Sequence, residues 1–172
     1  MKRIIFLLVE DELSNVESAI KAISEISGFE PVVHRAGKGN FYTFDRPTEP
    51  LHVFVAMGEC AAFRMKLCLD DETVSPDYIL LDLNFPSDIL STGKLLEGYS
   101  PKPFGFPILF DFLKYKPRGA VMITSARNHG GSMLPDGRHE IDGVPVEFVA
   151  DENEVKDWLT PLRRVWSPNP QT

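Results

Sequence analysis

The sequence has few of the features that mark secreted proteins. It contains two cysteines, Cys60 and Cys68, in 172 residues. Both fall in one expected helix, where eight residues of helical rise separate them by roughly 12 Å, too far for a disulfide. The simplest interpretation is a chain that folds without disulfides in a reducing, cytoplasmic compartment.

Long apolar stretches and basic clusters are missing as well. The first apolar run, Ile4 to Val9, is too short for a membrane span or a signal-peptide core, and acidic residues follow it. The formal net charge is −7, and the lysines and arginines are scattered. We therefore expect no nucleic-acid partner and no membrane surface as partner.

Short apolar runs alternate with amphipathic helical patterns along the chain. This alternation predicts an α/β domain with a mostly parallel sheet. The expected strands are Ile4–Val9, Leu51–Ala56, Tyr78–Asp82, Ala120–Thr124 and Val144–Val149. The expected helices run from a capping box at Ser14–Glu17 to Gly28, from about Glu59 to Leu69, from about Pro107 to Lys114, and from about Asp151 to Trp166.

This order predicts a (βα)₅ fold in one domain, residues 1–166, followed by a frayed tail at 167–172. Three inserts interrupt it, at about 31–50, 85–106 and 127–143. The first contains a turn at Gly37–Asn40 and has room for two short strands. The other two follow the carboxyl ends of strands, the edge where open α/β sheets bind ligands.

Three carboxylates are expected at that edge. Glu10 and Asp11 follow the first strand and Asp82 ends the third, so neighbouring strands would bring them together. Their mutual repulsion would be relieved by a hard divalent cation such as Mg²⁺. Thr124 adds a hydroxyl at the same rim, which gives a plausible site for placing a phosphoryl group on a carboxylate. The alternative is that these are ordinary polar strand ends.

Three segments, "IIFLLVEDE", "PDYILLDLNFP" and "GAVMITSA", resemble the receiver domain of two-component response regulators. The resemblance implies a flavodoxin-like fold, a five-stranded parallel sheet flanked by helices. It further implies that a histidine kinase or phosphotransfer protein phosphorylates Asp82. Glu10, Asp11, Asp82 and the backbone carbonyl of Asn84 would then hold Mg²⁺. Thr124 would be the switch hydroxyl, with Ser125 as the substitute if the strand ends one residue later.

One expected residue is missing from this pattern. The family has a lysine at the end of the fifth strand, whereas this chain has Val149, Ala150 and Asp151 there. The nearest lysine, Lys156, is expected about a turn and a half into the last helix, outside its apolar stripe, as a solvated charge. The sequence therefore predicts an atypical receiver without the usual lysine.

Three functions remain open from the sequence. The first is a single-domain response regulator that accepts phosphate on Asp82 with Mg²⁺ and acts through an unknown downstream protein. It would not be an enzyme beyond phosphoacceptor and self-dephosphorylation chemistry. The second is a pseudo-receiver that binds partners without phosphorylation, favoured by the missing lysine and the glycine-rich segment 127–143. The third is an aspartate-nucleophile phosphatase, disfavoured because Asn84 stands where a second aspartate would be.

Overall fold

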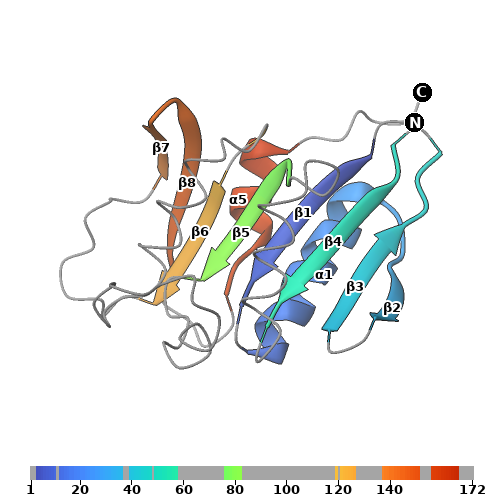
Figure 1. Ribbon diagram of the computed structural model, residues 1–172. Coiled ribbons are helices and arrows are strands. Elements are labelled where there is room, and N and C mark those ends of the chain that lie inside the picture. Colours follow the sequence, from blue (N-terminus) through green and yellow to red (C-terminus); the bar gives the residue numbers. More distant parts are fainter. Residues whose placement is uncertain are drawn as a thin grey trace, which may run out of the picture.

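A computed structural model describes residues 3–10, 12–36, 39–47, 49–57, 76–82, 119, 121–126, 137–151 and 156–166 (Figure 1). The strands are β1 (Ile4–Val9), β2 (Val32–Ala36), β3 (Gly39–Phe44), β4 (Leu51–Ala56), β5 (Tyr78–Asp82), β6 (Val121–Ala126), β7 (Gly137–Ile141) and β8 (Val144–Asp151). The helices are α1 (Leu13–Ser27) and α5 (Leu159–Val165). The helices expected at 59–69 and 107–114, and the tail at 167–172, lie outside these residues.

The strands form one eight-stranded sheet in the order β2-β3-β4-β1-β5-β6-β8-β7. The strands from β4 to β8 in this order are parallel, and along the chain they take the order 2-1-3-4-5. The expected α/β architecture with a mostly parallel sheet is confirmed. The sheet is wider than predicted because β2, β3 and β7 pair antiparallel at its two ends.

Both added hairpins have a local cause. The first insert forms β2 and β3, as the turn at Gly37–Asn40 suggested. The third insert was expected to be irregular throughout, and this is wrong for residues 137–141, which form β7. Asp142 and Gly143 connect β7 to β8 with φ of 52° and 79°. Two successive positive φ angles are typical of the tight turns that join antiparallel strands, and Asp-Gly is a favoured pair there.

The helix ends differ from their predicted positions. Gly28 ends α1 as expected, with φ of 74° and its N–H bonded to the carbonyl of Ser24. The predicted capping box at Ser14 is wrong, since the N-cap of α1 is Glu12, two residues earlier, and it makes no side-chain cap bond. The last helix begins at Leu159 instead of near Asp151. Asp157 Oδ1 accepts the N–H groups of Leu159 and Thr160, which fixes this start.

Helices α1 and α5 pack on one face of the sheet (Figure 1). Phe6 and Leu8 of β1 meet Trp158, Leu162 and Trp166 in one buried cluster. β1 is buried on both faces, since every residue from Ile5 to Val9 is at most 2% exposed, as expected of a central parallel strand. Among the residues that the structure describes, no helix is long and apolar enough to cross a membrane.

Asp77 joins the amino-terminal ends of β1 and β5, whose other ends carry the candidate site. Its Oδ2 accepts the N–H of Ile5 at 2.9 Å, and its own N–H donates to the carbonyl of Ile5. We predict that Asp77→Ala lowers the free energy of unfolding by about 1–3 kcal/mol, because a buried N–H loses its acceptor. Asp77→Asn keeps an acceptor oxygen and should lose less. Urea denaturation of both variants tests this, and equal losses would contradict it.

Candidate functional site

The candidate site lies where β1 and β5 end. The two strands are parallel neighbours with Val9 opposite Leu81, so Glu10 and Asp82 lie side by side at the carboxyl edge of the sheet. Their residues are 0% and 1% exposed. Two carboxylates in such surroundings need positive charge beside them, because burial and mutual repulsion both oppose ionisation.

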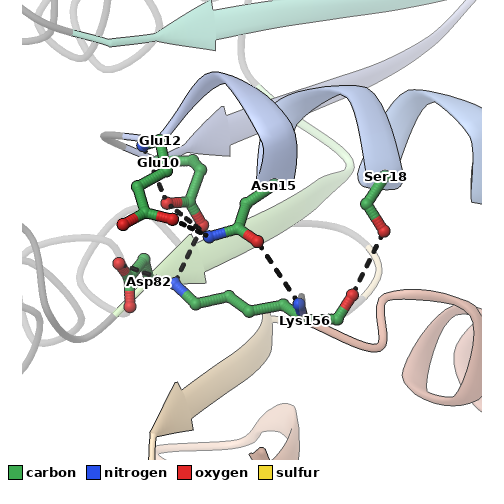
Figure 2. Close-up of polar contacts among 6 residues, drawn as sticks. All are labelled: Glu10, Glu12, Asn15, Ser18, Asp82 and Lys156. Atoms are coloured by element: carbon green, nitrogen blue, oxygen red, sulfur yellow. Dashed lines mark hydrogen bonds and ion pairs between the residues drawn. The ribbon is translucent and has the colours of Figure 1, made fainter. Parts of the chain in front are cut away.

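Lys156 supplies that charge. Its Nζ lies 2.9 Å from Glu10 Oε2 and 2.6 Å from Asp82 Oδ2, and its side chain is 8% exposed (Figure 2). The expectations that the site lacks a lysine and that Lys156 is a solvated charge on the last helix are therefore wrong. The cause is the late start of α5 at Leu159, which leaves Lys156 in the connection from β8, at the same edge of the sheet.

Helix α1 holds the backbone of Lys156 in place. The N–H of Lys156 donates to Asn15 Oδ1 at 3.3 Å, and Ser18 Oγ donates to the carbonyl of Lys156 at 3.2 Å (Figure 2). Asn15 Nδ2 also donates to Glu10 Oε1 at 3.4 Å and to Glu12 Oε2 at 3.3 Å. Asn15 thus links the lysine to one of the carboxylates that the lysine contacts.

Sequence reasoning missed Asn15 and Ser18 as parts of the site. Both fall in the segment interpreted as a capping box, where polar residues are ordinary. A signal was present in the helical spacing, because Asn15 precedes Val16 and Ala19 on the face that is buried. A buried asparagine on the apolar side of a helix requires polar partners, which here are Glu10 and the backbone of Lys156.

The charges of the site perturb one another. The pKa of Glu10 is raised from 4.5 to about 7, first by burial and then by the charge of Asp82, against the opposing effect of Lys156. Burial lowers the pKa of Lys156, but the charges of Asp82 and Glu10 together raise it above its ordinary value. When both carboxylates are ionised, one ammonium faces two of them, and the group carries one net negative charge.

The structure describes only some of the other residues that were predicted for the site. Thr124 pairs in register with Asp82, so its backbone lies at the expected rim. Ser125 follows it in β6, and the positions of the two hydroxyl groups lie outside what the structure describes. Asp11 and Asn84 also lie outside the described residues. Within the described ranges no three His, Cys, Asp or Glu side chains gather as a metal site, so Glu10 and Asp82 are the described part of the predicted Mg²⁺ ligands.

No protein-family model and no curated protein sequence matches the chain. Among solved structures, the cytosolic domain of the T. maritima FeoB iron transporter in a GDP form is similar at 11% identity. It has a TM-score of 0.45, with 87% of this chain and 57% of that chain covered.

Two further structures are similar over less of this chain. Futalosine hydrolase of Helicobacter pylori matches at 14% identity and a TM-score of 0.33, covering 48% of this chain and 34% of that chain. The Campylobacter jejuni 5'-methylthioadenosine/S-adenosyl homocysteine nucleosidase matches at 8% identity and a TM-score of 0.32, covering 46% and 32%. This chain thus spans less than two thirds of each of these structures.

The pKa of Glu10 makes stability depend on pH. Between about pH 4.5 and 7 the folded state keeps a proton on Glu10 that the unfolded state has lost, so the free energy of unfolding falls as the pH rises. The full change is about 3 kcal/mol. Glu10→Gln should remove this slope and leave a constant offset. Urea denaturation at pH 5, 6 and 7.5 in the presence of a chelator tests it, and parallel curves for the two proteins would contradict it.

Removing the ammonium should be costly. Lys156→Met leaves two buried carboxylates without their shared partner, and we expect about 3–5 kcal/mol of destabilisation at pH 8. Asp82→Asn in the same chain should recover part of this loss because it removes one of the repelling charges. Lys21→Met, on the exposed surface of α1, is the control and should change little. Additive effects of Lys156→Met and Asp82→Asn would show that the two groups do not interact.

Proposed function

We propose that the protein is a receiver-like signalling protein that accepts a phosphoryl group on Asp82. The observation that carries this proposal is the contact of Lys156 Nζ with both Asp82 and Glu10. The chain order of the parallel strands, 2-1-3-4-5, is that of flavodoxin-like sheets and supports the same assignment. In such sheets ligands bind where the strand order reverses, and β1 and β5 meet at that point.

The chemistry requires little beyond positioning. A carboxylate oxygen of Asp82 attacks the phosphorus of the donor, forming an O–P bond. The P–N bond of a phosphohistidine, or the P–O bond of an acyl phosphate, breaks, and the leaving group takes the electron pair. The ammonium of Lys156 is already within 2.6 Å of Asp82 Oδ2, so it can pair with the phosphoryl oxygens as their charge arrives. Thr124, opposite Asp82 in register, would donate its hydroxyl to the same oxygens.

Mg²⁺ fits the described residues in donor type and in charge. Glu10 and Asp82 offer hard oxygen donors, and together with Lys156 they are short of one positive charge. Glu10, Asp11 and Asp82, with the backbone carbonyl of Asn84, would hold the ion. When bound, it offsets the repulsion between Asp82 and an anionic phosphoryl donor.

The donor would be a histidine kinase or phosphotransfer protein, and the output would pass to a downstream protein by direct contact. A phosphorylation-independent binding module is the alternative. The main argument for this alternative was that the site lacks a lysine, and the contact of Lys156 with Asp82 removes that argument. Its second argument was the glycine-rich segment 127–143, of which residues 137–141 are an ordinary strand.

The test is incubation of the protein with Mg²⁺ and acetyl phosphate, followed by intact-mass measurement. We expect one added phosphoryl group, absent in Asp82→Asn. Lys156→Met should slow its formation by about 100-fold or more, because a preorganised charge is lost at the transferring group. Lys21→Met is the matched control and should react like the unaltered protein.

Two outcomes would contradict the proposal. Failure of the folded protein to gain any phosphoryl group from acetyl phosphate, together with no Mg²⁺ binding by calorimetry, would favour the binding module. An adduct that persists in Asp82→Asn would assign the phosphoacceptor to another residue. Circular dichroism of each variant establishes that it is folded before its reactivity is compared.

A further inference from the structure

β7 and β2 lie at the two ends of the sheet (Figure 1), and they differ in the side chains that they expose. β7 exposes charged Arg138 and Glu140, which discourage pairing with another strand. β2 instead exposes two adjacent valines, Val32 at 46% and Val33 at 53%. Since side chains alternate along a strand, these valines lie on opposite faces of the sheet. Among the described residues, β2 therefore has an apolar surface on both faces and an open backbone edge.

On the Val33 face, β2 adjoins a pocket between α1 and the hairpin. Val33 pairs in register with Tyr42, which lines a cavity of about 470 Å³. Ile20, Pro31 and Tyr42 give it an apolar floor, while Glu17, Lys21 and Glu30 are exposed around it. The pocket thus combines apolar area with charged groups at its mouth.

The mouth of this pocket is negative. Glu25, which also lines it, is paired with Arg163 at 2.5 Å. The other charged residues that line the pocket are Lys21, which is positive, and Glu17 and Glu30, which are negative, so the net charge of these three is negative. Burial raises the pKa of Tyr42, and the negative charge of Glu17 raises it further, so the charge of Glu17 acts on the inner part of the pocket. A guanidinium or ammonium on an apolar stem suits such a pocket, because the stem covers the floor and the charge stays at the mouth.

The opposite face of the hairpin carries a row of stacked rings. His34 stacks on Phe41 with 4.6 Å between centroids, and Phe41 stacks on Phe54 at 5.9 Å. His34 Nε2 also lies 2.7 Å from Thr43 Oγ1, which fixes the imidazole in this row. The row ends at β2, where His34 is its outermost ring and Val32 lies on the same face. An apolar side chain from an added strand would continue it.

β2 itself has the sequence that such an added strand needs. A second copy of β2, placed antiparallel with Val33 opposite Val33, pairs Val32 with His34 and Pro31 with position 35. Position 35 is an arginine, two residues from Val33 and therefore next along the same face. The pairing thus places position 35 of each copy opposite Pro31 of the other, which lines the acidic pocket together with Glu30. Val32 of each copy, which lies opposite His34 of the other, would also cover the end of the partner's ring row.

We propose that the protein forms a two-fold symmetric dimer in which β2 of one copy pairs antiparallel with β2 of a second copy, centred on Val33. The arrangement is isologous, so each copy contributes the same edge and the same acidic pocket. Its sheet continues across both molecules, and the outward N–H and C=O groups of the two β2 strands are paired. The candidate site at Asp82 belongs to β5 and takes no part in this interface.

Sedimentation equilibrium of the full chain over a range of concentrations tests the dimer. We expect a reversible monomer–dimer equilibrium that Val33→Lys weakens by tenfold or more, because two ammonium groups would meet across the axis. Glu140→Lys makes a comparable change on the other edge strand and should leave the equilibrium unaltered. A protein that stays monomeric throughout, or a dimer that Val33→Lys leaves intact, would overturn the proposal.

A charge exchange tests the register. Arg35→Glu should weaken the dimer by tenfold or more because it adds a negative charge next to the acidic pocket of the other copy, and Glu30→Arg in the same chain should restore it. Failure of the double variant to recover would overturn the pairing centred on Val33. Asp82→Asn should dimerise like the unaltered protein, so a failed phosphorylation experiment and a failed dimer are distinguishable. Thermal unfolding of each variant establishes that it is folded.

Discussion

The arrangement of the carboxyl edge depends on one interaction, the ion pairing of Lys156 with Glu10 and Asp82. Each carboxylate is almost fully buried, and each would resist ionisation beside the other without a cation. The lysine reaches them from the connection between β8 and α5, so three separate parts of the chain must be in place before the charges balance. A buried network of this kind adds little net stability, but breaking it is costly, so it specifies one arrangement.

Helix α1 makes the lysine position precise. Asn15 and Ser18 bind the backbone of Lys156, and Asn15 also binds Glu10, so the helix orients both the cation and one of its partners. The same helix packs its apolar side with α5 on the sheet. A displacement of α1 would therefore disturb the lysine directly. The fold and the chemistry of the site are coupled through this helix.

The sequence was informative about strands and less so about where helices begin. The bounds of β4 and β5 were predicted correctly, because each is a short apolar run with a clear end. Because β1 and β5 are parallel neighbours, the predicted ends of these two strands then put Glu10 and Asp82 at one edge of the sheet. Lys156 was misplaced because the apolar spacing of Val155, Trp158 and Leu162 continues upstream of the true helix. Spacing shows which side is buried, while the start of α5 depends on the hydrogen bonds that Asp157 accepts.

The extended sheet edges were harder to predict for another reason. β7 has the sequence GRHEI, with charged residues at 138 and 140 and no apolar run, so its strand character depends on pairing with β8 across the Asp142–Gly143 turn. The first hairpin was visible from its glycine-containing turn, but its place at the sheet edge was not. Pairing between distant strands is decided by packing of the whole sheet, which local patterns do not contain.

The most direct measurement is nuclear magnetic resonance of the Lys156 ammonium group in ¹⁵N-lysine-labelled protein at neutral pH. A buried ammonium held by two carboxylates should exchange its protons slowly enough to give a resolved signal. That signal should shift in Asp82→Asn and in Glu10→Gln and be missing in Lys156→Met. A Lys156 signal that is averaged with those of exposed lysines, or that neither carboxylate variant alters, would contradict the central role of this ion pair.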